Sequence, residues 1–112
     1  MAPIPVAEVL ASPRAIEARD ALNPSQRRKL DWWIARLKTD AFAGDQIPKR
    51  LIPPMLAVRH GLPGPLSNAW RFELPGGWRG IYRVADEEKR PPTVVILEIL
   101  SHKDYDRLFG YR

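Results

Sequence analysis

The sequence predicts an α+β domain in which an N-terminal strand and a helical hairpin pack on a small antiparallel sheet. Helix-capping signals and helical spacing occur before residue 44, whereas three strand-like segments fill residues 69–100. Turn residues separate these strands closely enough for antiparallel pairing. The expected order is β-α-α-β-β-β with a short C-terminal helix, in one domain spanning residues 1–112.

The N-terminal part holds a strand and a first helix. Residues 5–11 alternate weakly and are rich in Val and Leu, which indicates a short strand. Ser12 followed by Pro13 has the form of an N-cap with proline in the first helical position. We therefore expect a short helix that runs to about residue 22.

The second helix has the clearest pattern in the chain. Asn23, Pro24 and Gln26 form a capping-box signature at its start. Gly44 is expected to end it as the residue after the C-cap. The apolar stripe at helical spacing consists of Leu30, Trp33, Ile34, Leu37 and Ala41.

Residues 44–67 contain five prolines and three glycines, which exclude long regular structure. A loop of this length in a small domain is disordered or functional. We expect it to pack on the body of the domain, because it carries several apolar side chains: Leu51, Ile52, Met55, Leu56 and Val58.

The C-terminal part is rich in strands. Residues 69–74 and 78–84 form a hairpin around a Pro-Gly-Gly corner. Residues 93–100 are nearly all apolar, as expected of a central strand covered on both faces. Ser101 then caps a last short helix that Gly110 ends.

Strand alternation predicts two different faces for the hairpin. Trp70, Phe72, Leu74, Trp78, Tyr82 and Val84 share the face that packs under the helices. The opposite face collects Arg71, Glu73, Arg79 and Arg83. One interpretation is a solvated sheet face with weak cross-strand ion pairs. The surplus of arginine over glutamate favours a binding site for an anion.

The amino-acid composition limits the reactions, cofactors and partners that can be expected of this chain. The chain has no cysteine and two histidines, so thiolate chemistry is excluded and neither a metal site nor a cofactor is expected. A net charge of +5 favours a polyanionic partner. No apolar run is long enough to span a membrane and no secretory signal is recognisable, so a cytoplasmic protein is expected. Few Asn and Gln together with twelve prolines predict a thermophilic source.

The charged face has the residue types needed to cleave a phosphodiester without metal. His102, Lys103 and Tyr105 follow the last strand directly and are expected at the edge of this face. In such chemistry a base deprotonates a ribose 2′-hydroxyl, an acid protonates the leaving oxygen, and guanidinium groups stabilise the charge on phosphorus. Arginine suits the last role because its planar fork binds phosphate oxygens in pairs.

Three segments resemble the RelE/ParE toxin superfamily, and most closely its RelE-like branch. They are NAWRFELPGGWRGIYRV at 68–84, VVILEILSHKDYDRLFGYR at 94–112 and GDQIPKRLIP at 44–53. The resemblance implies a toxin of a type II toxin–antitoxin pair that cleaves mRNA in the ribosomal A site by 2′-hydroxyl attack. Its partners would be the ribosome, mRNA and an acidic antitoxin protein that masks the basic surface.

The resemblance also implies roles for single residues. Arg79 matches the arginine that stabilises the transition state, and Arg71 matches a basic residue of the preceding strand. Lys103 and His102 lie where family members place basic residues after the last strand. Glu73 stands where the best-known branch has lysine, although other members use a glutamate base. 

The family's C-terminal tyrosine falls on Phe109 by counting. Tyr105 and Tyr111 are the candidates to replace it.

Other interpretations stay open. One alternative is a ParE-like inhibitor of DNA gyrase without catalysis, and another is a non-toxic RNA- or protein-binding module. Arg27, Arg28 and Lys29 at the start of the second helix are further candidates for RNA binding. Of the adjacent Trp32 and Trp33, one is expected in the core and the other at the surface. His60 has no partner in the sequence pattern and is expected to have no function.

Overall fold

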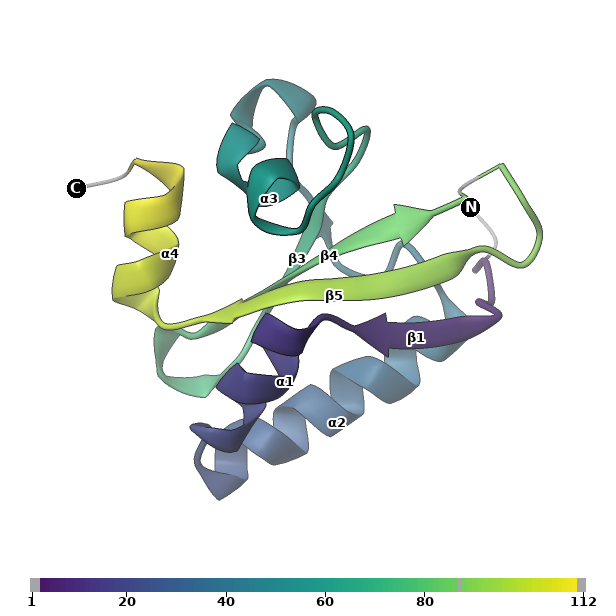
Figure 1. The fold of residues 1–112 in the computed structure, drawn as a ribbon. Helices are drawn as coiled ribbons and strands as arrows, with labels where there is room; N and C mark the ends of the chain where they lie inside the picture. Colours follow the sequence, from purple (N-terminus) through teal and green to yellow (C-terminus); the bar gives the residue numbers. More distant parts are fainter. Residues whose placement is uncertain (1–2, 87, 111–112) are drawn as a thin grey trace.

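The computed structural model describes residues 3–86 and 88–110 and confirms the α+β fold class (Figure 1). The elements, in chain order, are β1 Glu8–Ala11, α1 Pro13–Asp20, α2 Pro24–Thr39, β2 Asp45–Gln46, η1 Lys49–Leu51, α3 Pro54–Arg59, β3 Trp70–Glu73, η2 Pro75–Gly77, β4 Arg79–Ala85, β5 Thr93–Leu100 and α4 His102–Phe109.

These elements form one five-stranded sheet in the order β1-β5-β4-β3-β2. The predicted antiparallel pairs β3–β4 and β4–β5 are confirmed. The edge strand β1 differs, because it runs parallel to β5. The short strand β2 was not predicted and extends the other edge by pairing with β3. As expected, β5 lies inside the sheet and is almost entirely buried.

Helices cover both faces of the sheet. In Figure 1, α1 and α2 lie below it and α3 and α4 lie above it. The core under α1 and α2 is built on aliphatic residues of these helices and on Phe72, Tyr82 and Ile96. The core under α3 and α4 includes Leu56 and Tyr105. The sheet therefore separates two hydrophobic cores, one on each of its faces.

The predicted helix starts are confirmed by their hydrogen bonds. The Ser12 hydroxyl accepts from the backbone of Ala15. Asn23 and Gln26 form both bonds of the capping box, at 2.8 and 2.9 Å. At the end of the chain Gly110 adopts a left-handed conformation with φ of 75° and terminates α4. Local capping chemistry thus fixes the ends of the helices that flank the sheet.

The predicted role of Gly44 is wrong. Helix α2 already ends at Thr39 and its C-cap is Asp40. Gly44 instead allows two segments to approach closely, since a Cβ there would lie 2.6 Å from the carbonyl oxygen of Arg71 and 2.9 Å from the Tyr82 hydroxyl. Its own N–H donates to that hydroxyl at 3.0 Å.

The proline-rich segment 44–67 packs on the sheet, as predicted, but through fewer side chains than expected. Leu56 is fully buried in the core under α3 and α4, and Ile52 contacts that core. Leu51, Met55 and Val58 are exposed, which corrects the prediction for these three residues. Met55 and Val58 are exposed because helix α3 turns one side toward the sheet and the other toward solvent, whereas Leu51 ends the preceding η1. None of the described helices is both long and apolar enough to cross a bilayer.

Tyr82 makes the stability of this fold sensitive to high pH. Burial raises the pKa of its phenol above the ordinary value of 10.0, and the hydrogen bond from Gly44 offsets only part of this effect. Stability that depends on the neutral phenol is fully present below about pH 10 and declines as the pH rises further.

We expect the wild-type free energy of unfolding to fall more steeply above about pH 10 than that of Tyr82→Phe. Urea unfolding at a series of alkaline pH values measures this slope. Because the variant lacks one hydrogen bond at every pH, its free energy of unfolding should be lower by a constant of about 1 kcal/mol. Only a difference in slope between the two proteins tests the prediction. Parallel curves for the two proteins would contradict the prediction.

Candidate functional site

The β3–β4 hairpin divides its residues between two faces, as the alternation predicts. Trp70 pairs with Tyr82 and Phe72 with Gly80 on the side of α1 and α2. Glycine is required at position 80, because a Cβ there would lie 2.1 Å from the Phe72 ring. Trp33 of α2 stacks on Phe72 with 5.4 Å between ring centroids. This aromatic packing fixes which residues of the hairpin turn to the other face.

That other face presents the charged residues. Arg71 lies opposite Ile81, and Glu73 lies opposite Arg79, in the β3–β4 register. Arg71 and Arg79 are half-buried, while Glu73 is exposed. The predicted gathering of these three side chains on one sheet face is therefore present in the structure.

Tyr105 of α4 joins the two arginines into one unit, which we call the Arg–Tyr cluster (Arg71, Arg79 and Tyr105). A terminal nitrogen of Arg71 donates to the Tyr105 hydroxyl at 3.2 Å. The guanidinium carbon of Arg79 lies 4.5 Å from the centroid of the Tyr105 ring. Tyr105 is buried and stacks on Phe109 at 4.3 Å. The cluster therefore holds two positive charges in a fixed arrangement against one aromatic ring.

The surroundings keep Arg71 protonated. The hydrogen bond to the Tyr105 hydroxyl is the largest cause that raises the pKa of Arg71, while burial acts in the opposite direction. The nearby carboxylates of Asp45 and Glu73 raise the pKa further. Arg71 also lines a pocket of about 210 Å³ between β2 and α4, together with Tyr105 and Phe109. The cluster is therefore a permanent cationic site beside an open hollow.

His102 and Lys103 begin α4 at the same end of the sheet. Arg79 pairs with Leu100, so α4 starts two residues beyond this pair. The hairpin corner also reaches His102, since a Cβ on Gly77 would lie 3.2 Å from the Cβ of His102. The His102 ring contacts Asp106 at 3.1 Å and both His102 and Lys103 are exposed. Both residues thus lie at the end of the sheet where Arg79 pairs with Leu100, and neither belongs to the Arg–Tyr cluster.

Arg83 lies on the same face but farther along the strand. Four residues of β4 separate it from Arg79, which corresponds to roughly 13 Å. It pairs with Val95 and borders a hollow of the proline-rich segment at residues 62–67. Arg83 is therefore placed to contact an extended ligand rather than the same group as the cluster.

The basic residues of α2 are not brought to this face. Arg27 donates to the carbonyl oxygens of Leu22 and Asp20, at 3.2 and 2.8 Å, and so closes the end of α1. Lys29 lies 3.9 Å from the Trp32 ring centroid. 

Together with the exposed Arg28, these side chains belong to the helix layer on the opposite side of the sheet. As predicted, Trp32 is exposed at 51% while Trp33 packs on the core.

A second charged group was not predicted. Glu98, in the apolar strand β5, is 1% exposed. Both of its carboxylate oxygens accept a hydrogen bond from Arg14 Nε, at 3.1 and 2.9 Å. Arg59 contacts it at 3.3 Å and the His60 Nε2 lies 2.5 Å away. His60 is thus a partner of a buried carboxylate, which the sequence pattern did not reveal. A single glutamate within an apolar strand was the available signal.

Tyr111, the other tyrosine candidate, lies outside the described residues. Tyr105 is the tyrosine that contacts both arginines in the structure. Within residues 3–86 and 88–110, no group of three or more acidic or histidine side chains is arranged to hold a metal ion.

Comparison with known proteins supports the fold assignment. No family model and no curated protein matches the sequence. Among solved structures, a mutant of the E. coli toxin RelE in the free state matches over 98% of this chain and 93% of that chain. The TM-score is 0.57 and the sequence identity is 15%. The five-stranded sheet, its covering helices and this match show that the chain has the RelE/ParE fold.

Proposed function

We propose that this chain is a RelE-like toxin of a type II toxin–antitoxin system, which acts in the cytoplasm and cleaves mRNA on the ribosome. The observation that carries the proposal is the Arg–Tyr cluster. Two guanidinium groups on one tyrosine ring repel each other, and a bound anion offsets that repulsion. Their planar forks match the oxygens of a phosphate group.

The reaction follows from what lies around the cluster. Arg71 and Arg79 bind the scissile phosphate, and Glu73 takes the proton from the neighbouring 2′-hydroxyl. The 2′-oxygen attacks phosphorus and the bond to the 5′-oxygen breaks, which leaves a 2′,3′-cyclic phosphate and a 5′-hydroxyl. His102, at the hairpin corner, protonates the departing 5′-oxygen. Lys103 adds positive charge beside it.

Tyr105 has a positioning role in this proposal. Its ring is buried, so it orients the two arginines and does not need to reach the reacting atoms. Arg83, farther along β4, binds the RNA backbone beyond the cleaved nucleotide. An acidic antitoxin would cover the same positive surface and compete with RNA for it.

The direct test uses purified protein and ribosomes carrying a defined mRNA. We expect the wild-type protein to cut the mRNA at a nucleotide in the A site, and to leave supercoiling by DNA gyrase unchanged. Gyrase inhibition without RNA cleavage would replace the proposal with the ParE-like alternative. Absence of both activities, together with harmless expression in a host cell, would favour a non-toxic binding module.

A further inference from the structure

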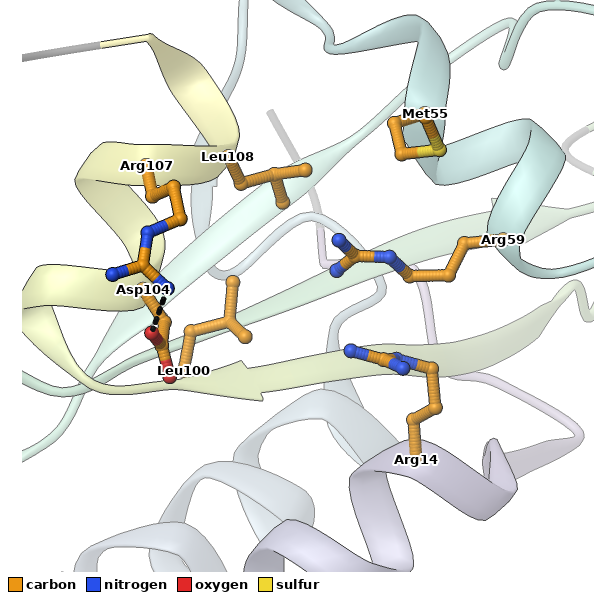
Figure 2. Close-up of a pocket in the computed structure, with 7 residues that line it drawn as sticks. All are labelled: Arg14, Met55, Arg59, Leu100, Asp104, Arg107 and Leu108. Carbon is orange, nitrogen blue, oxygen red and sulfur yellow. Dashed lines mark ion pairs between the residues drawn. The ribbon is translucent and has the colours of Figure 1, made fainter.

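A pocket of about 450 Å³ lies where β5 ends, between α1, α3 and α4 (Figure 2). Each of these helices contributes one arginine to it, and we call it the triple-arginine pocket (Arg14, Arg59 and Arg107). Its volume falls within the ~300–1,000 Å³ that is typical of small-ligand sites. Helix α4 separates it from the Arg–Tyr cluster, because Arg107 and Tyr105 turn to different sides of the helix.

Glu98 orients two of the three arginines. Arg14 donates to both carboxylate oxygens through Nε, and its guanidinium has further N–H donors that can bind a second anion. Arg59 contacts the carboxylate through one terminal nitrogen. Figure 2 shows Arg14 and Arg59 reaching the same space from helices on opposite sides of β5. The buried carboxylate thus preorganises two cations around one opening.

Arg107 lines the pocket on the side of α4, and Figure 2 shows its guanidinium turned toward Asp104. Its partner is Asp104, at 3.5 Å, and the two side chains are 70% and 56% exposed. An ion pair this exposed contributes little to stability, because solvent screens it. Arg107 can therefore exchange Asp104 for another anion at small cost.

The charges of the pocket leave a positive surplus. Arg14, Arg59 and Arg107 carry three positive charges, and Glu98 and Asp104 carry two negative charges. The difference between these five groups is one positive charge. A phosphodiester group neutralises this surplus.

We propose that the triple-arginine pocket binds a phosphate group. A tetrahedral phosphate offers oxygens in several directions, so it can bind Arg14 and Arg59 together and also Arg107 once that side chain leaves Asp104. A carboxylate offers two oxygens in one plane and can engage fewer of them. The adjoining hollow past Arg14 is lined by Glu17, which repels anions and confines the phosphate to the side of α3.

The phosphate belongs to an RNA strand that also occupies the Arg–Tyr cluster and passes around α4. That the phosphate comes from RNA rests on the proposed function, whereas the ability of the pocket to bind a phosphate group does not. The strand would contact the protein on both sides of α4, so that the pocket adds affinity without taking part in cleavage.

The test measures binding of a single-stranded RNA of about 12 nucleotides by fluorescence anisotropy over a range of salt concentrations. Arg107→Gln should weaken binding about tenfold, and the slope of log K against log salt should decrease in magnitude by roughly 0.7. The matched control is Lys38→Gln on α2, a basic residue outside both sites, which should bind like the wild type. Wild-type affinity and slope in Arg107→Gln would overturn the proposal.

A second variant separates phosphate binding from folding. Arg59→Gln leaves Glu98 with one cation fewer, so it is combined with Glu98→Gln to remove the buried charge as well. The double variant should unfold at a temperature near that of the wild type and still bind RNA weakly. Recovery of wild-type RNA affinity in the double variant would mean that Arg59 acts only on stability, and would overturn its role in the pocket.

The source of the phosphate is tested by NMR of the arginine Nε–Hε groups in the full chain. Shifts of Arg14, Arg59 and Arg107 with RNA, and not with inorganic phosphate, would support a backbone phosphate. Shifts with inorganic phosphate and no RNA binding would keep the pocket as a phosphate site but remove RNA as its source, and would count against the proposed function. Shifts with poly-glutamate alone would overturn the proposal in favour of an acidic protein partner.

Discussion

The Arg79→Ala protein should cleave mRNA on programmed ribosomes roughly 10²–10³ times more slowly than the wild type. Arg79 lies opposite Glu73 in the hairpin register and stacks on Tyr105, so its charge is fixed where the phosphate would gain negative charge. Loss of one preorganised donor at such a position removes stabilisation of the transition state. Single-turnover cleavage rates measure the effect, and toxicity in a host cell should fall with them.

Two further variants show whether the fork of Arg79 matters or only its charge. Arg79→Lys keeps the charge but loses paired contact with phosphate oxygens, so its rate should lie between those of wild type and alanine. Lys38→Ala on α2 removes one positive charge from the other side of the sheet and should cleave normally. Cleavage by Arg79→Ala at the wild-type rate would contradict the role assigned to this residue.

Tyr105→Ala should have the largest effect on stability, at about 3–5 kcal/mol. The ring is 1% exposed and stacks on Phe109, and its loss leaves a cavity between α4 and the sheet. Because the Tyr105 hydroxyl contacts Arg71 and its ring contacts Arg79, the variant should also lose the fixed arrangement of the cluster. Denaturant unfolding at neutral pH gives the free energy.

Tyr105→Phe isolates the hydroxyl from the ring. It keeps the stacking and loses the acceptor for Arg71, so stability should fall by only about 1 kcal/mol. If Tyr105 positions Arg71, this variant should bind RNA more weakly while α4 stays folded. Equal loss of stability in the Phe and Ala variants would show that packing of the ring is not what holds α4.

The hairpin face could be predicted from the sequence because its determinants are local. Alternation assigns Phe72 and Tyr82 to one side and Arg71 and Arg79 to the other, and the Pro-Gly-Gly corner sets the register. Helix caps such as Ser12 and the Asn23–Gln26 capping box could also be predicted, because their partners lie only three residues away in the sequence.

The remaining features depend on contacts that are distant in the chain. The parallel pairing of β1 with β5 joins residues about 85 positions apart, and no local pattern encodes its direction. Helix α3 begins at the second of two adjacent prolines and is only six residues long, so its packing on the sheet rather than a sequence pattern defines it. Glycine is a residue that often ends helices, but at position 44 it is needed because a side chain would collide with Tyr82 and with the backbone of Arg71.

The candidate site was predicted in its residue types and only partly in its arrangement. The sequence places Tyr105 near the face but does not show that its side chain is buried or that it contacts both Arg71 and Arg79. The partnership of His60 with Glu98 spans 38 positions, so neither residue indicates the other in the sequence. Side-chain networks of this kind are fixed by packing rather than by local spacing.

The central claim, cleavage by 2′-hydroxyl attack on a phosphate held at the Arg–Tyr cluster, is tested most directly by changing the nucleophile. Ribosomes are programmed with two mRNAs that differ only in one 2′-deoxynucleotide, placed immediately 5′ to the cleaved phosphate. We expect the all-ribose mRNA to be cut to a 2′,3′-cyclic phosphate end and the deoxy-substituted mRNA to remain intact. Cleavage of both mRNAs at the same phosphate and the same rate would contradict the proposed mechanism.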